Sequence, residues 1–135
     1  MAQEHLWAGA NQYQLWYQRF GRIQQQLNAL QDAHLKVLRI FLGHRDQYLS
    51  WEDPPEAYTF ENPVGTFHDE NLEKVDYLMS ECQKRGIKLI IALSTHSQPY
   101  LDKYGPIEIY RSSASINDHK NRFTHFLDHF NSYLG

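Results

Sequence analysis

Three short apolar segments alternate along the chain with three longer stretches in which apolar residues recur at helical spacing. The short segments span residues 6–11, 35–42 and 87–93. A short apolar run bounded by polar residues or glycine is typical of a buried β-strand. Strands that alternate with helices usually form a parallel sheet with the helices packed on it. The pattern therefore predicts an α/β domain of three βα units, with its strands in the order 1-2-3.

The third apolar segment is the most regular. Ile87 to Leu93 is apolar apart from Lys88, and we expect a strand buried on both faces, because a strand with one wet face would alternate. Gly86 is expected to end the preceding helix by adopting a positive φ. Polar residues 94–96 follow the strand, at the end where parallel α/β folds place their sites. A plain core strand that exits into a loop explains the same pattern.

Each expected helix has a recognisable apolar stripe. The stripe residues are Phe20, Ile23, Leu27 and Leu30 in the first helix, Leu72, Val75, Met79 and Cys82 in the second, and Phe123, Phe126 or Leu127, Phe130 and Leu134 in the third. Gly21 weakens a helix, so the first is expected to start after it. Asp69 is expected to cap the second, and Asn117 or Asp118 the third. Cys82 is expected to be an inert core residue.

Two long connections, 43–68 and 94–116, are expected to be loops, and long loops are often functional. Trp51 has no periodic apolar neighbours, so it either binds a ligand or pins its loop to the body of the protein. The loop carboxylates are each expected to be solvated: Asp46, Glu52, Asp53, Glu61, Asp102 and Glu108.

Composition excludes several classes of function. The net charge is −3 and the pI about 6.2, so we expect neither nucleic acid nor a membrane surface as partner. No apolar run approaches the length of a membrane span, and the first residues do not predict a signal peptide. Aromatic residues make up 14% of the chain, which suits either a generous core or surfaces that stack on sugars or bases.

Cofactor and metal motifs are absent from the sequence. No glycine-rich nucleotide loop follows a strand, and no Gly-x-Ser-x-Gly motif is present. His125 and His129 are one helical turn apart but lack the glutamate and third ligand of a zinc site, so we expect them on a solvated face. Arg39 is unusual within an apolar strand. It either reaches water at the strand end or holds a carboxylate in a site.

Three stretches together resemble family 5 glycoside hydrolases, especially the fungal endo-β-mannanase type. Residues 7–13, Trp-Ala-Gly-Ala-Asn-Gln-Tyr, resemble the Gly-x-Asn-x-Tyr/Trp opening of that family's first strand. Residues 36–41, Lys-Val-Leu-Arg-Ile-Phe, resemble its second strand with a site-facing Arg. Residues 69–93 resemble the second helix and third strand, including Arg-Gly-Ile-Lys. The likeness covers about residues 6–134.

The resemblance implies a partial (β/α)8 TIM barrel, with residues 1–135 as one truncated glycoside-hydrolase-like domain. It implies a polysaccharide or oligosaccharide of the β-linked mannan or glucan type as partner. The substrate-binding residues that it suggests are Asn11, Tyr13, Arg39, Trp51 and His96. Of these, Asn11, Arg39 and His96 are expected to converge at the carboxyl ends of the strands, and Arg39 would hold the nucleophile carboxylate.

The family's two catalytic glutamates follow its fourth and seventh strands, and neither segment is present in this sequence. We therefore assign no catalytic residue, cofactor or metal, and expect the chain to be inactive alone. A non-catalytic carbohydrate-binding or assembly module is the alternative, and an unrelated three-unit α/β domain a third. Such a piece has two open sheet edges, so we expect marginal stability and self-association. Family members are usually secreted, but the first residues of this chain do not predict a signal peptide, so its localisation is left open.

Overall fold

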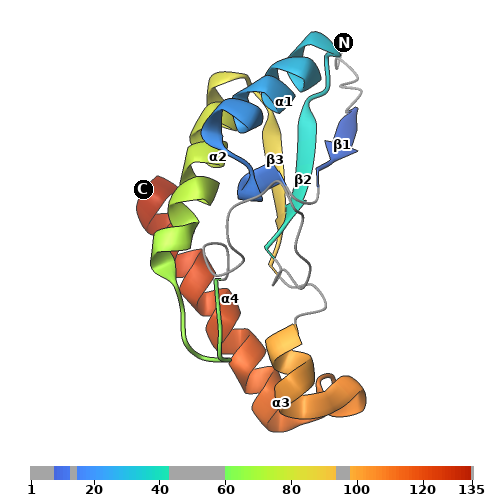
Figure 1. The fold of residues 1–135 in the computed structure, drawn as a ribbon, viewed down its shortest axis with the longest axis vertical. Coiled ribbons are helices and arrows are strands. Elements are labelled where there is room, and N and C mark those ends of the chain that lie inside the picture. The colour runs from blue at the N-terminus through green and yellow to red at the C-terminus, as the bar shows by residue number, and fades with distance from the viewer. Residues whose placement is uncertain (1–7, 13–14, 43–59, 94–97, 135) are drawn as a thin grey trace, which may run out of the picture.

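The computed structural model describes residues 8–12, 15–42, 60–93 and 98–134. Its strands are β1 (Gly9–Asn11), β2 (Val37–Phe41) and β3 (Lys88–Ala92). Its helices are η1 (Leu15–Tyr17), α1 (Phe20–Asp32), η3 (Asp69–Leu72), α2 (Glu73–Lys84), α3 (Gln98–Glu108) and α4 (Ser113–Leu134). Within these ranges the strands form one parallel sheet in the order β1-β2-β3, as predicted. In Figure 1, α1, α2 and α4 form a layer beside the sheet, and α3 lies beyond the carboxyl ends of the strands.

The register of the sheet decides which side chains share a face. Asn11, Arg39 and Ile90 are neighbours across the three strands. Because side chains alternate along a strand, Leu38 points to the opposite face, where it is 0% exposed, whereas Ile90 is 52% exposed. The prediction that β3 is buried on both faces is therefore wrong for this chain, since its described helices pack on one face only.

The core lies between the sheet and the helix layer. It contains Leu15, Trp16, Ile23, Leu27, Leu30, Leu38, Ile40, Leu42, Phe60, Leu72, Val75, Leu78, Cys82, Ile87, Phe126 and Phe130. Trp16 stacks on Phe60 at a ring-centroid distance of 4.3 Å, and Phe60 meets Phe126 edge-on at 5.4 Å. Cys82 is buried as predicted, and burial raises the pKa of its thiol to about 12. The predicted stripes of α1 and α2 thus supply much of this core.

The sequence predicts the end of α2 correctly but not the start of α1. Gly86 ends α2 at a φ of 65°, and Ile87 N donates to Cys82 O at 2.9 Å, as expected of a glycine C-cap. The first helix, however, starts at Phe20 and contains Gly21. An added Cβ at Gly21 would meet nothing within 4 Å, so its only handicap is the modest loss of helix propensity.

The connection 94–116 is not the loop that its prolines and tyrosines predict. It holds α3 and the first turn of α4. Gly105, at a φ of 75°, breaks α3 in two, and Pro106 then opens the second piece, a position that proline tolerates. The true cap of α4 is Ser112, whose Oγ accepts from Ser115 N at 3.3 Å. Asn117 and Asp118 therefore lie inside the helix, and the prediction that they cap it is wrong.

Candidate functional site

The face of the sheet opposite the described helices, called the open face below, is polar near the carboxyl ends of β1 and β2. Asn11 and Arg39 lie side by side there, both exposed. Gly9 permits this close pairing, because a Cβ at that position would lie 2.8 Å from Val37 O and 3.0 Å from Val37 Cβ. The two strands are also joined past the ladder, where Gln12 N donates to Arg39 O at 3.0 Å.

Arg39 presents its guanidinium on this face. Its Cζ lies 4.5 Å from the centroid of the Phe41 ring, a distance typical of a cation–π contact. Its side chain is exposed, and within the described ranges no carboxylate pairs with Arg39. A guanidinium carries five N–H donors in one plane.

The predicted site residues divide into two groups. The structure places Asn11 and Arg39 at partnered positions of β1 and β2. Tyr13, Trp51 and His96 lie outside the described residues, so their part in the site stays a prediction.

A buried ion pair that the sequence analysis missed lies behind the same strand ends. Arg122 of α4 is 2% exposed and Glu61 is also 2% exposed, with Arg122 Nη1 donating to Glu61 Oε2 at 2.7 Å. The guanidinium also donates from Nη2 to Leu42 O at 2.6 Å and from Nε to Leu93 O at 3.1 Å. The prediction that Glu61 is a solvated loop charge is therefore wrong, because it is the counter-ion of a buried arginine.

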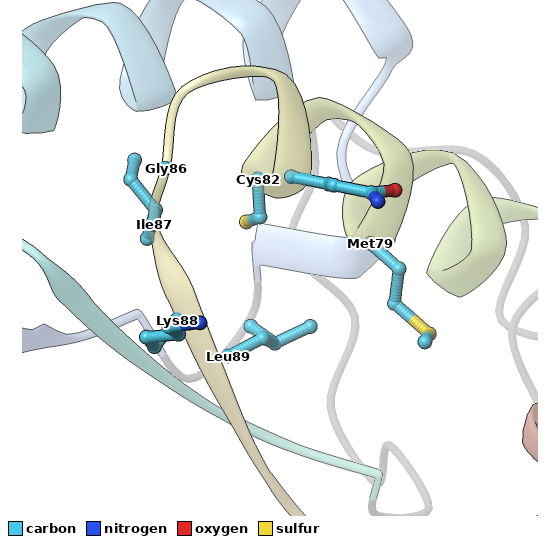
Figure 2. Close-up of a pocket in the computed structure, with 7 residues that line it drawn as sticks. Met79, Cys82, Gly86, Ile87, Lys88 and Leu89 are labelled. Atoms are coloured by element: carbon cyan, nitrogen blue, oxygen red, sulfur yellow. The ribbon is translucent and has the colours of Figure 1, made fainter. Parts of the chain in front are cut away.

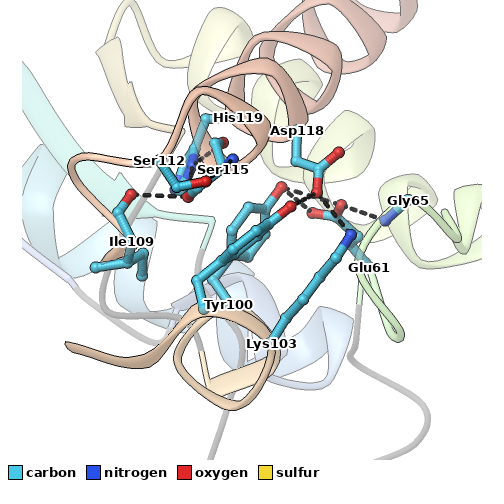
Figure 3. Close-up of polar contacts among 10 residues, drawn as sticks. Glu61, Gly65, Tyr100, Lys103, Ile109, Ser112, Ser115, Asp118 and His119 are labelled. Atoms are coloured by element: carbon cyan, nitrogen blue, oxygen red, sulfur yellow. Dashed lines mark hydrogen bonds and ion pairs between the residues drawn. The ribbon is translucent and has the colours of Figure 1, made fainter. Parts of the chain in front are cut away.

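Glu61 is held by further donors. Gly65 N donates to its Oε1 at 2.8 Å, and Tyr100 OH lies 3.1 Å and 3.2 Å from its two oxygens. Figure 3 shows Tyr100 reaching from α3 towards this carboxylate. Burial, followed by the charge of Glu61, raises the pKa of Tyr100 well above its ordinary value. Tyr100 therefore stays protonated and acts as a donor to Glu61.

One sequence signal marks Arg122. It lies four residues before Phe126 and eight before Phe130, which places it on the buried stripe of α4. A charged residue on such a stripe needs a partner. The partner, Glu61, is distant in sequence, and no local pattern links the two positions.

A second polar cluster fastens α3 to α4. Lys103 Nζ donates to Asp118 Oδ2 at 2.8 Å (Figure 3), and Tyr104 OH donates to the same oxygen. These hydrogen bonds, that of Lys103 first and that of Tyr104 second, lower the pKa of the Asp118 carboxyl. Because these hydrogen bonds join side chains of α3 to a side chain of α4, the partly exposed cluster holds the two helices together.

The two histidines of α4 are paired with acids. His125 Nε2 donates to Asp69 Oδ1 at 2.5 Å, and His129 Nε2 donates to Asp76 Oδ2 at 2.9 Å. Both rings are partly buried, which differs from the fully solvated face that the sequence predicts. Among the described residues, no group of three or more His, Cys, Asp or Glu side chains is arranged to hold a metal ion.

A pocket of about 410 Å³ lies between α2 and the amino-terminal half of β3. Met79, Cys82, Ile87 and Leu89 supply its apolar walls (Figure 2). This pocket is on the helix side of the sheet, away from Arg39. No helix of the described chain combines the length and the apolarity that crossing a membrane requires.

Three parallel βα units with an open inner face and an outer layer of helices make up part of a (β/α)8 barrel. Solved barrels with this fold include an endo-1,4-β-mannanase from Rhizomucor miehei, which has a TM-score of 0.67 at 18% identity. The match covers 88% of this chain and 36% of the mannanase. No protein-family model and no curated protein matches the sequence.

Two further solved structures agree with this fold. A hyperthermostable endo-1,4-β-D-mannanase from Thermotoga petrophila matches with a TM-score of 0.67 at 21% identity, over 96% of this chain and 40% of that one. A glycoside hydrolase family 5 mannosidase from Rhizomucor miehei matches with a TM-score of 0.61 at 14% identity, over 85% of this chain and 35% of that one. The chain thus spans well under half the length of the barrels whose fold it shares.

Proposed function

We propose that this chain is the three-unit portion of a glycoside hydrolase barrel of the mannanase type, and that its open sheet face binds a β-linked polysaccharide. The observation that carries the proposal is the exposed pair of Asn11 and Arg39 near the carboxyl ends of adjacent strands. It is supported by the fold shared with solved mannanases. In parallel barrels that end of the strands carries the site.

The chemistry of the pair suits a sugar. The Arg39 guanidinium supplies several N–H donors in a fixed plane, and the Asn11 amide supplies both a donor and an acceptor. The Phe41 ring under the guanidinium limits its freedom, which lowers the entropy lost on binding. Tyr13 and Trp51 join the proposal as sugar-stacking rings, and His96 as a polar contact, on the sequence resemblance alone.

Hydrolysis needs two carboxyl groups on opposite sides of the glycosidic bond. Glu61 lies near the strand ends, but its oxygens are occupied by Arg122, Tyr100 and Gly65. It is therefore a structural counter-ion in this proposal. The 135-residue chain is expected to bind without cleaving, and the catalytic carboxylates would belong to other segments of a complete barrel.

The test is calorimetric titration of the purified chain with mannohexaose, together with a reducing-sugar assay. We expect saturable binding, no release of reducing ends, and loss of most of the affinity in Arg39→Ala. Lys88→Ala is the matched control, because Lys88 is exposed on the same face but at the amino end of β3. Equal losses in both variants, or no binding by the wild-type chain, would overturn the proposal.

Assembly with another polypeptide is the second candidate, and the edge of β3 favours it. Lys88 N donates to Lys36 O and Leu42 N donates to Ala92 O, so the backbone groups of Leu89 and Ile91 point away from β2. Within the described residues no strand pairs with this apolar edge, and an edge of this kind is a template for another strand. Light scattering after size-exclusion chromatography distinguishes the cases: a concentration-dependent dimer that Ile90→Lys, a change at an exposed side chain of the same strand, abolishes supports assembly, and a monomer at all concentrations contradicts it.

A further inference from the structure

The carbonyl of Leu42 is the first backbone carbonyl beyond the end of β2. Leu42 N donates to Ala92 O at 2.9 Å, which is the last backbone hydrogen bond between β2 and β3 within the described residues. Arg122 Nη2 donates to Leu42 O at 2.6 Å. A side chain from α4 thus donates to the first carbonyl beyond the end of β2.

The same guanidinium reaches the end of β3. Its Nε donates to Leu93 O at 3.1 Å, so one rigid planar group joins the carbonyls that follow both strands. A guanidinium holds such an arrangement better than an ammonium, because its donors have a fixed geometry. Arg122 therefore fixes the distance between the ends of β2 and β3.

Arg122 is itself held in place from several directions. Glu61 neutralises its charge at 2.7 Å, and its Cζ lies 5.0 Å from the centroid of the Phe126 ring. Gly65 N and Tyr100 OH in turn orient the Glu61 carboxylate. With these partners the guanidinium has one preferred position, which a lone buried charge would not have.

The end of β2 is also the support of the exposed guanidinium of Arg39. That group lies over the ring of Phe41, the residue before Leu42. On its other side, Phe41 O accepts from Trp16 Nε1 at 2.9 Å. Arg122 and Trp16 thus hold consecutive carbonyls, and between them they set the place of Phe41.

We propose that Arg122 is a positioning residue for the carbohydrate face: by joining the ends of β2 and β3, it holds Phe41, and through it Arg39, where a sugar can be bound. The inference rests on the proposed function for its ligand. The fixing of the strand ends, however, is a statement about the native chain and can be measured without any sugar.

The experiment compares Arg122→Lys with Arg85→Lys, both under conditions in which the chain is folded. Arg85 is a matched control, because it also pairs with a carboxylate, Glu81, at 2.6 Å, but it lies beyond the end of α2 and contacts neither strand end. The measurements are amide hydrogen exchange of Leu42 relative to Ile40, the NMR signal of Arg39 Nε–H, and titration with mannohexaose.

In Arg122→Lys we expect exchange at Leu42 to rise about tenfold relative to Ile40, because a charge-assisted hydrogen bond near it is lost. The Arg39 signal should shift, and mannohexaose affinity should fall about tenfold. In Arg85→Lys all three measurements should keep their wild-type values, even if the melting temperature falls. An Arg122→Lys chain that melts earlier but keeps all three wild-type values would show a structural role only and overturn the proposal.

The outcomes separate this proposal from the one it rests on. If the wild-type chain binds no mannohexaose, the proposed function fails, and Leu42 exchange with the Arg39 signal still decides the role of Arg122. If Arg122→Lys does not fold, the double variant Glu61→Gln/Arg122→Met removes both buried charges and is measured in the same way. Wild-type Leu42 exchange and an unshifted Arg39 signal in that variant would overturn the positioning role.

Discussion

The two faces of the sheet are built from the same strands but differ in solvent exposure. On the helix side Leu38 and Ile40 are completely buried, whereas on the open side Arg39 and Ile90 are exposed. Alternate residues of one strand thus differ in environment although most of them are apolar. The apolar pattern of a strand therefore shows which of its faces could be buried. Whether a face is buried depends on whether another element packs on it.

The two arginines at the ends of the strands extend the comparison. Arg122 lies on the covered side, where its guanidinium donates to Glu61 and to Leu42 O, and Arg39 lies on the open side against the Phe41 ring. A buried charge is tolerated because its partners are in place. An exposed one is left to solvent or to a ligand.

The largest expected effect is the contrast between these arginines. Arg122→Ala should lower the free energy of unfolding by about 3–5 kcal/mol, because it leaves Glu61 buried and unpaired. Arg39→Ala should change it by less than about 0.5 kcal/mol, as for other surface substitutions. Urea denaturation of both variants measures the difference. Equal costs would mean that the two sides of the sheet are not distinct.

The next effect compares apolar residues on the two faces. Leu38→Ala should cost about 2–5 kcal/mol, because it leaves a cavity under the helices. Ile90→Ala should cost less than about 1 kcal/mol, because half of that side chain is already in water. The same denaturation series reports both. A cost at Ile90 that matches the cost at Leu38 would indicate that the open face is covered in solution, by a second copy or another partner.

A pair of glycine substitutions tests the close approach of β1 to β2. Gly9→Ala should destabilise by about 1–3 kcal/mol, because its Cβ would press on Val37 and a backbone carbonyl cannot easily yield. Gly21→Ala is the same change at a helical position with open space around it, and it should stabilise by about 0.5–1 kcal/mol. Thermal melts give both signs. Stabilisation by both would show that β1 is not held tightly against β2.

The smallest effect concerns the α3–α4 cluster, away from both faces. The lowered pKa of Asp118 means that its contribution is present above the pKa it has when unfolded, near 4, and is lost as the pH falls through its folded value. Asp118→Asn should therefore be less stable than wild type at pH 7, by less than about 1 kcal/mol. The two should converge once the pH falls below the folded pKa of Asp118. A difference that grows towards low pH would contradict the assigned ion pair.

Local pattern was enough to predict much of the fold. The strands and their order follow from apolar runs and the crossover rule, and Gly86 ended α2 because only glycine adopts its positive φ readily. The α3 helix was missed because Gly105 and Pro106 resemble a loop, although they only join two helical pieces. The start of α4 was missed because Ser112, rather than a later Asn or Asp, is the residue that caps it.

The candidate site was less predictable than the fold. Arg39 stands out in sequence because it interrupts an apolar strand, and Asn11 follows from the family resemblance. Glu61 and Arg122 are far apart in the chain, so neither could be assigned a partner from local sequence, and Glu61 had the appearance of an ordinary loop acid. Long-range electrostatic pairs are visible only once the topology brings two elements together.

The most direct test of the account is an NMR titration of the isotope-labelled chain with mannohexaose, comparing the two faces in one experiment. We expect saturable shifts at Asn11, Arg39 and the Arg39 Nε–H, with Ile23, Leu27 and Val75 on the helix side unchanged. Shifts confined to the helix side, or a spectrum that does not change at millimolar sugar, would contradict the claim that the open face is the carbohydrate-binding face.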